Sequence, residues 1–319
     1  MSIFLLHENE AWLPPFRAAF ARQDLAVTEW HLAEGDFDFS APPPAGVFYN
    51  RMSASSHTRG HDAAPELTAA LLAWLEAHGR RVINGSRALD LEVSKIRQYA
   101  ALESRQVRVP ATRFASGREA LRRAAREIDA PFIAKPNRGG KGLGVQLFSD
   151  AEAFEAWLDS PDFDAGRDGV LLLQQRIQSP DASIIRCEFV GGRFLYAVRV
   201  DTSDGFELCP ADACRIEDAA CPVGESAPRA MFEILPGFEH ENLERYARVL
   251  ADNDIQIAGI EMIVDADGTA WTYDINTNTN YNPEAEAAAG LAEGAGSGPD
   301  MVARLLARES RATAFEKAA

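Results

Sequence analysis

The sequence predicts an α/β fold of the mixed, α+β kind, made of more than one compact unit. Strand and helix patterns alternate through residues 1–88, which is typical of a parallel sheet with helical crossovers. Two later segments, residues 131–148 and 184–200, read as hairpins closed by glycine. A chain of 319 residues is long enough for two or three such units, each with its own core.

Composition argues against several classes of protein. Hydrophobic residues make up 46% of the chain, so we expect a globular protein rather than a disordered one. The net charge of −16 disfavours general binding to nucleic acid or anionic membranes, although it allows a local basic pocket for an anionic substrate. No apolar run reaches the length of a membrane span, and residues 1–12 lack the features of an export signal. We therefore expect a cytoplasmic protein.

The four cysteines are expected to be reduced thiols in such a compartment: Cys187, Cys209, Cys214 and Cys221. Three of them fall within one short segment, which raises the alternative of a zinc site. Their spacing contains no CxxC pair, no histidine lies nearby, and a fourth ligand is not evident. Small buried or half-exposed thiols are the favoured interpretation, and the role of this segment stays open.

The first 88 residues have the pattern of a small parallel sheet. Leu67, Leu71 and Leu75 recur at helical spacing, and a Pro-rich turn at residues 42–44 precedes a strand. The predicted elements are strands at 3–6, 26–32, 46–49 and 81–83 and helices at 15–23 and 65–78.

Residues 50–61 (NRMSASSHTRGH) follow directly on one of these strands and are almost entirely polar. Loops at the carboxyl ends of parallel strands commonly bind ligands, so Asn50, Arg51, His57 and Arg59 are candidates for holding an anionic substrate. A polar surface loop that caps the next helix is an equally weighted alternative. A metal site on two histidines of this loop is a weaker idea, because no third ligand is apparent.

The middle of the chain continues with alternating elements. An Asn-Gly turn at residues 84–85 precedes a helix that carries Lys95 and extends to residue 102. Ser116 followed by Glu119 has the form of a capping box for a helix over 116–128. The remaining elements expected here are strands at 107–114 and 169–177 and a helix at 151–159.

The glycine-rich hairpin at residues 131–148 (PFIAKPNRGGKGLGVQLF) is the strongest single signal. Glycine has no Cβ, so such a loop can expose backbone N–H groups to an anion, and a lysine on the first strand can contact phosphate oxygens. The chain has only four lysines, which makes lysine here notable. An ordinary hairpin with a mobile tip is the alternative for the glycines alone. The candidate residues are Lys135, Gly139, Gly140, Lys141, Gly142 and Gly144.

The last third of the chain places charged residues on two further hairpins. Arg186 and Arg199 lie on the two arms of the hairpin at 184–200. Glu261, Asp274 and Asn276 lie at one end of a hairpin formed by 256–265 and 269–275, and oxygen donors of this kind suit Mg²⁺. A charged strand end facing solvent is the alternative. The other expectations are irregular structure at 206–224 and helices at 240–253 and 301–307.

Together, these pieces resemble the ATP-grasp superfamily, and most closely its RimK-type glutamate ligase branch. The resemblance covers residues 84–286, and it implies three domains: a pre-ATP-grasp α/β domain at 1–88, a central subdomain at 89–177 and a C-terminal subdomain at 178–319 that together clamp ATP. Lys95 and Lys135 match the family's two ATP-contacting lysines. Residues 174–177 match the hinge that holds adenine, namely Gln174, Gln175, Arg176 and Ile177.

The resemblance also implies roles on the last two hairpins. Arg186 and Arg199 match arginines that neutralise phosphate and a developing oxyanion, and Glu261, Asp274 and Asn276 match the magnesium ligands. Where the family has a ribose-contacting Asp, this chain has Ile184, with Ser183 or Asp181 as alternatives. The RimK acceptor segment is replaced by residues 206–221 (FELCPADACRIEDAAC), and Asn278 belongs to an extended Asn-rich segment that is expected to line the substrate pocket.

What the resemblance implies is an ADP-forming carboxylate–amine ligase that uses ATP with Mg²⁺, or with Mn²⁺ as an alternative ion. Its acid and amine could be a free amino acid, a peptide or a carrier-protein tail, with no nucleic-acid or membrane partner; a homo-oligomer stays open. A phosphotransferase on the same scaffold is the second hypothesis. A non-catalytic nucleotide-binding regulator is disfavoured, because both lysines and all three candidate metal ligands are present.

Overall fold

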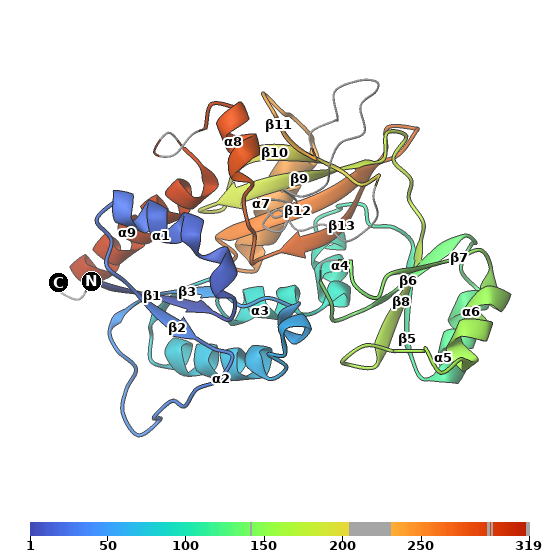
Figure 1. Ribbon diagram of the computed structural model, residues 1–319, viewed down its shortest axis with the longest axis horizontal. Helices are drawn as coiled ribbons and strands as arrows, with labels where there is room; N and C mark the ends of the chain where they lie inside the picture. Colours follow the sequence, from blue (N-terminus) through green and yellow to red (C-terminus); the bar gives the residue numbers. More distant parts are fainter. Residues whose placement is uncertain (141, 204–230, 292–293, 295, 317–319) are drawn as a thin grey trace, which may run out of the picture.

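The computed structural model describes residues 1–140, 142–203, 231–291, 294 and 296–316. The strands in these ranges form three sheets (Figure 1), which confirms the predicted α/β class. Lys141, the three clustered cysteines and the segment predicted to be irregular at 206–224 lie outside the described residues. Within the described part of the chain, no helix is long and apolar enough to cross a membrane.

The N-terminal sheet is parallel throughout, as the alternating pattern predicted. Its strand order is β2-β1-β3-β4. The strands are β1 (Ser2–His7), β2 (Val27–His31), β3 (Gly46–Arg51) and β4 (Arg81–Ile83). The helices and 3-10 turns that connect them are η1 (Glu10–Trp12), α1 (Pro14–Arg22), η2 (Ser56–Arg59) and α2 (Ala64–Ala77).

Both faces of this sheet are covered, and the side chains of β1 alternate between them. Ile3 and Leu5 belong to a core shared with α1, whereas Phe4 and Leu6 belong to a core shared with α2. The first face is also covered by α9 (Gly298–Glu316), which packs against α1 and β3 (Figure 1). The final helix is therefore much longer than predicted at 301–307, and it lies on the N-terminal sheet.

The central sheet is antiparallel, with strand order β5-β8-β6-β7. Its strands are β5 (Thr112–Ser116), β6 (Phe132–Pro136), β7 (Gln146–Phe148) and β8 (Val170–Gln175). Two helices, α5 (Arg118–Arg126) and α6 (Ala151–Asp159), pack on one face around Phe132, Phe148 and Phe154. The glycine-rich hairpin is confirmed as the β6–β7 pair.

The third sheet is also antiparallel, with strand order β11-β10-β9-β12-β13. Its strands are β9 (Ser183–Val190), β10 (Arg193–Asp201), β11 (Phe232–Leu235), β12 (Ile257–Val264) and β13 (Ala270–Asn276). Helices α3 (Ser86–Glu92), α4 (Lys95–Glu103) and α7 (Asn242–Asp252) cover one face around Cys187, Phe189 and Ile260. The sequence did not predict β11 or the short helix α8 (Pro283–Ala288).

Three sequence predictions in the middle of the chain were wrong in detail. The single helix at 84–102 is two, α3 (Ser86–Glu92) and α4 (Lys95–Glu103), because Ser94 is extended and its side chain caps α4. The capping box at Ser116 does not form, since Ser116 still pairs with β8 as part of β5 and the N-cap residue of α5 is Gly117. The strand predicted at 107–114 starts later, after Pro110, which has no N–H to donate.

Helices α3 and α4 pack against β13, although they precede the central sheet in sequence. Helix α9 follows the third sheet in sequence but packs on the N-terminal one. These three helices therefore pack against sheets to which they are not adjacent in the sequence. The division into domains at residues 88 and 177 stays a prediction.

Asn84 joins the N-terminal sheet to the third sheet. The residue is fully buried with a left-handed φ of 55°, as an Asn-Gly turn favours. Its Nδ2 donates to the carbonyls of Ile257 and Thr277 at 2.7 and 2.8 Å, and its Oδ1 accepts from the backbone N–H groups of Gln256 and Ile257. Asn50 adds to this junction by donating to the Asn84 carbonyl at 2.9 Å.

His7, at the carboxyl end of β1, is expected to make stability depend on pH. The residue is 2% exposed, and Nδ1 has no hydrogen-bond partner among the described residues. Burial lowers the pKa of His7 to about 4. An unfolded chain, with an ordinary histidine pKa of about 6.5, takes up a proton more readily, so stability falls as pH drops from 6.5 towards 4, by up to about 3 kcal/mol.

Urea unfolding of the wild type and of His7→Asn, followed by tryptophan fluorescence between pH 7.5 and 5, measures this effect. We expect the His7→Asn protein to lose less stability across the range. His78→Asn is the matched control, because His78 is exposed. If the free energy of unfolding changed with pH equally in the wild type and in His7→Asn, the pH dependence could not be attributed to His7.

Candidate active site

A cavity of about 380 Å³ lies where the three sheets meet. It is lined by side chains of the central sheet, by one face of the third sheet and by the loop after β3. The predicted site residues that line it are Lys95, Lys135, Gly139, Gly140, Gly142, Gln174, Gln175, Arg176, Ile177, Ser183, Arg186, Glu261, Asp274, Asn276 and Asn278. Gly144, Arg199, Asn50, Arg51, His57 and Arg59 do not line it.

Lys135 on β6 is buried in the cavity wall without a carboxylate partner among the described residues. Its Nζ donates to the Tyr99 hydroxyl at 2.7 Å and lies 5.3 and 5.8 Å from the ring centres of Tyr99 and Tyr273. Burial, together with the positive charge of Lys95, lowers the pKa of Lys135 to about 7. An ammonium held in this way is well placed to gain an anionic partner.

Lys95 comes to the same cavity as the first residue of α4. The start of α4 is fixed to the strand that carries Lys135, because Asn137 Oδ1 accepts hydrogen bonds from Ser94 Oγ and the Ile96 N–H at 3.1 and 3.0 Å. The Lys95 ammonium contacts the Asp274 carboxylate. Burial opposes its charge, but Asp274 outweighs burial and raises the pKa of Lys95.

The described part of the glycine-rich loop lies against the loop that follows β3. A Cβ built on Gly140 would lie 3.1 Å from Cβ of Ser55, so the two backbones approach closely here. Arg138 also reaches Glu66 on α2 at 2.6 Å. Gly144 is turned away and packs on Pro136, with φ of 74°.

The end of β8 forms another part of the wall. Gln174 donates from Nε2 to the Tyr99 hydroxyl at 2.6 Å and to Thr112 at 3.0 Å. Residues 175–177 follow it along the cavity. Ser183 lines the same side and donates to Asp181 at 2.6 Å, so both alternatives for a ribose contact lie together.

Arg186 is the arginine that lines the cavity on the third sheet, whereas Arg199 is directed elsewhere. Arg186 Nη1 donates to Glu261 at 2.7 Å and Nη2 donates to Thr279 Oγ1 at 2.5 Å. Arg199 instead pairs with Glu233 on the neighbouring strand β11. The sequence placed both arginines on one hairpin but could not show which one faces the cavity.

Three oxygen donors share the cavity-facing side of the last hairpin. Strand register places Glu261 opposite Asp274, and Asn276 lies two residues further along the same face. Asn276 Nδ2 donates to Glu261 Oε1 at 3.2 Å, so these side chains meet. Two carboxylates and an amide fit Mg²⁺. No group of three His, Cys, Asp or Glu side chains among the described residues makes an alternative metal site.

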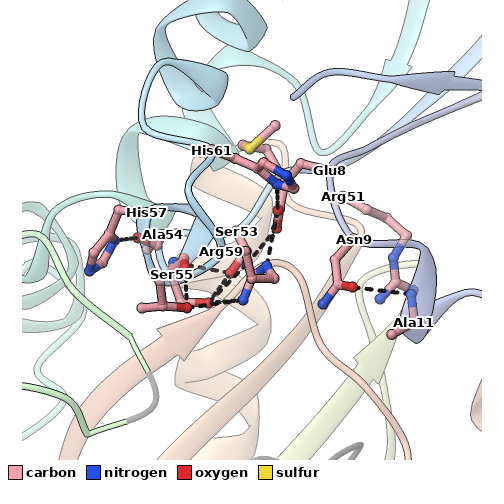
Figure 2. A network of polar contacts seen from close by, with 12 residues as sticks. Glu8, Asn9, Ala11, Arg51, Ser53, Ala54, Ser55, His57, Arg59 and His61 are labelled. Carbon is pink, nitrogen blue, oxygen red and sulfur yellow. Dashed lines mark hydrogen bonds and ion pairs between the residues drawn. The ribbon is translucent and has the colours of Figure 1, made fainter. Parts of the chain in front are cut away.

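The polar loop after β3 contributes Ser53, Ala54 and Ser55 to the cavity rather than the residues predicted from the sequence. Figure 2 shows how Arg59 supports this loop: it pairs with the buried Glu8 at 2.5 Å and donates to Ser55 Oγ at 3.2 Å. His57 Nδ1 donates to the Ala54 carbonyl at 3.2 Å, within the loop itself. Arg59 and His57 thus hold the loop, and their side chains do not enter the cavity.

Arg51 is buried beneath the site. Its guanidinium stacks 3.8 Å from the ring centre of Phe16 and donates to Asn280 Oδ1 at 2.8 Å. Asn280 in turn lines the cavity beside Asn278, whose Oδ1 is buried and has no partner in the described part of the chain. The Asn-rich segment is therefore confirmed as part of the cavity wall.

Sequence reasoning missed Glu92, Trp12 and Tyr99. Glu92 lines the cavity and accepts hydrogen bonds from the N–H groups of Ala54 and Thr277 at 3.2 and 2.7 Å, tying two walls together. Burial raises the pKa of Glu92, although these hydrogen bonds oppose the shift. All three residues lie on helical or turn segments with ordinary apolar spacing, so no local pattern marked them.

Comparison with curated proteins finds partial matches. A probable alpha-L-glutamate ligase of Teredinibacter turnerae is 28% identical over 131 residues, which are 41% of this chain and 42% of the relative. A protein of the same name from Vibrio atlanticus is 26% identical over 137 residues, 43% of this chain and 44% of the relative. The chain thus matches less than half the length of these relatives. No family model matches it.

Solved structures match over nearly the whole chain. A RimK domain protein ATP-grasp from Sphaerobacter thermophilus aligns with a TM-score of 0.65 at 17% identity, covering 96% of this chain and 99% of that one. The D-cycloserine synthetase DcsG aligns with a TM-score of 0.63 at 17% identity, and the alignment covers 96% of this chain and 99% of that one. The ATP-grasp ligase PsnB, complexed with a precursor variant, Mg and ADP, aligns with a TM-score of 0.63 at 15% identity. This alignment covers 97% of this chain and 98% of that one. The chain therefore has the ATP-grasp fold, and its resemblance to RimK-type ATP-grasp ligases is confirmed.

Proposed function

We propose that this protein is an ADP-forming carboxylate–amine ligase that activates its acid with ATP. One observation carries the proposal: a single cavity gathers Lys95, Lys135 and Arg186 with the oxygen donors Glu261 and Asp274. Cations facing acidic oxygen donors across one cavity suit a metal-bound polyphosphate. The named relatives and structural neighbours are ligases, which supports the same reaction class.

We further propose how ATP lies in the cavity. Adenine would contact residues 174–177, and Ser183 or Asp181 would contact the ribose. Lys95, Lys135 and the N–H groups of the glycine-rich loop would hold the phosphates. Glu261, Asp274 and Asn276 would hold Mg²⁺, with Mn²⁺ as the alternative; the bound ion would neutralise phosphate charge.

In the proposed reaction, a carboxylate oxygen of the acid attacks the γ-phosphorus of ATP. The bond from that phosphorus to the β–γ bridging oxygen breaks, and ADP leaves. The amine nitrogen then attacks the acyl phosphate carbon, and phosphate leaves as the nitrogen loses a proton. Arg186 stabilises the oxyanion on that carbon, and the lysines orient the phosphates, so the chain works mainly by positioning and charge.

The acid and amine would enter on the side of the cavity formed by Ser53, Ser55 and Asn278. The buried amide oxygen of Asn278 has no partner among the residues that the structure describes, so it would accept a hydrogen bond from an amine. Arg59 and His57 would act indirectly, by holding the serine loop. The substrate class extends to a free amino acid, a peptide or a carrier-protein tail.

Trapping experiments test the proposal. ADP release is measured with Mg-ATP and a panel of acids, first with hydroxylamine as the amine and then with amino acids and short peptides. We expect ADP together with a hydroxamate, and then an amide identified by mass spectrometry for a specific acid–amine pair. Lys135→Met is the control for contaminating ATPases.

Two outcomes would overturn the proposal. A stable phosphate ester without hydroxamate would establish the phosphotransferase alternative, which none of the comparisons favours. Failure of the folded protein to bind ATP in the presence of Mg²⁺ would reject the site itself.

ATP binding is expected to take up a proton. With a pKa of about 7, Lys135 is largely neutral at pH 8 in the free protein. Bound phosphates favour its charged form and raise its pKa, so binding at pH 8 should consume up to about one proton, and affinity should fall as pH rises above 7. Calorimetry in buffers of different ionisation enthalpy measures the uptake. Lys135→Met should abolish it; heats that do not depend on the buffer in the wild type would refute the prediction.

A further inference from the structure

Glu188 is a buried carboxylate that the proposed reaction leaves without a role. It lies two residues after Arg186 on β9, on the same face of the strand, and is 2% exposed. Its Oε1 accepts from Arg186 Nε at 2.6 Å, and its Oε2 accepts from Thr279 Oγ1 at 2.8 Å. Thr279 also accepts from Arg186 Nη2, which closes a three-membered network.

Gly259 supplies the space in which the Arg186 guanidinium lies. Strand register places Gly259 on β12 directly opposite Glu188. A Cβ on Gly259 would lie 2.6 Å from Nε, 2.7 Å from Nη2 and 2.9 Å from Cζ of Arg186. The guanidinium thus rests against the β12 backbone, and only a residue without a side chain permits this placement.

Charge explains why Glu188 is needed beside Glu261. Within the described ranges, Arg186 pairs with the carboxylates of Glu188 and Glu261. Under the proposed function, Glu261 shares its charge with a metal ion, which weakens its electrostatic interaction with Arg186. A buried guanidinium needs a counter-charge, and Glu188 is the carboxylate that remains for it. Its second oxygen is fixed by Thr279, so the position of that charge is set before substrates arrive.

We propose that Glu188 and Gly259 are positioning residues for Arg186, which hold its guanidinium at the reacting carbonyl while Glu261 serves the metal. The inference rests on the proposed function for the role of Arg186. Its geometric part, that these two residues fix the guanidinium, does not depend on which acid and amine are joined.

Glu188→Gln removes the charge and keeps the shape. We expect kcat to fall by about 30- to 100-fold, because a misplaced catalytic group can cost about 10²-fold. The Kd for ATP should stay within threefold, and Glu188→Asp should recover part of the lost kcat. Glu286→Gln is the matched control: Glu286 is also a buried carboxylate, held by Tyr196 and the Gly298 N–H away from the cavity, and this variant should keep its kcat.

Gly259→Ala tests the same placement from the opposite strand. The added methyl group would displace the guanidinium, so we expect a similar fall in kcat with ATP affinity retained. Gly35→Ala is the matched control, since a Cβ there would meet no described residue within 4 Å. A kcat within twofold of the wild type in both Glu188→Gln and Gly259→Ala would overturn the proposal. The proposal would also be overturned if each variant and its control lost kcat equally.

A structural measurement separates this inference from the proposed function. Crystal structures of the wild type and of both variants should show Arg186 at Glu188 in the wild type and displaced in Gly259→Ala and Glu188→Gln. This result is informative even if no acid–amine pair gives ADP. An Arg186 side chain that keeps its position in both variants would refute the positioning role.

Discussion

Arg186→Lys should lower kcat by roughly 10²- to 10³-fold, the usual cost of losing a preorganised oxyanion donor. The guanidinium reaches three acceptors at once, on Glu188, Glu261 and Thr279. A lysine ammonium is a single point of charge and cannot satisfy this planar arrangement, so the carbonyl would lose an oriented donor. The Kd for ATP should change by less than about threefold, because both lysines and the glycine-rich loop are untouched.

The measurement is steady-state ADP release at saturating ATP, with ATP binding followed separately by calorimetry. Arg193→Lys is a matched control on the same sheet, since Arg193 is exposed and lies outside the cavity. An Arg186→Lys protein with wild-type kcat would remove Arg186 from the reaction. A large loss of ATP affinity at unchanged kcat would make it a nucleotide-binding residue instead.

Asn84→Ala should destabilise the folded protein by about 3–5 kcal/mol, near the upper end for a single substitution. The change removes the side-chain partner of two buried carbonyls, one buried N–H group and one partly buried N–H group at the junction of the N-terminal and third sheets. Alanine also tolerates the left-handed φ of 55° poorly. Both effects act on the folded state.

Urea unfolding of Asn84→Ala and Asn84→Gly separates the two contributions. Glycine adopts the left-handed conformation without strain, so Asn84→Gly should report the lost hydrogen bonds alone and be less destabilised by about 1 kcal/mol. A loss below 1 kcal/mol in Asn84→Ala would show that the junction does not depend on this side chain.

Local spacing accounts for what the sequence predicted correctly. Lys135 and the glycines lie within one hairpin, and Glu261, Asp274 and Asn276 lie on another, so strand periodicity alone puts each group on one surface. The N-terminal sheet was predictable because its strands and helices alternate plainly.

Long-range packing accounts for what the sequence could not predict. Lys95 meets Asp274 only because Asn137 fixes the start of α4 to β6, and no local pattern encodes that contact. Arg59 was predicted to bind substrate because its actual partner, Glu8, lies 51 residues away in the sequence and no local pattern links the two. Glu188 was overlooked because one acidic residue in an apolar strand carries no motif; its meaning comes from Gly259 on another strand.

Helix α9 has a consequence for how the protein is made. One face of the N-terminal sheet is covered by α1 and by α9, whose residues are synthesised long after the sheet itself. While the ribosome is still translating the third sheet, apolar side chains such as Leu305 and Leu306 are not yet available to cover Val47 and Tyr49. The nascent N-terminal sheet should therefore stay protease-sensitive and dependent on chaperones until α9 emerges and docks.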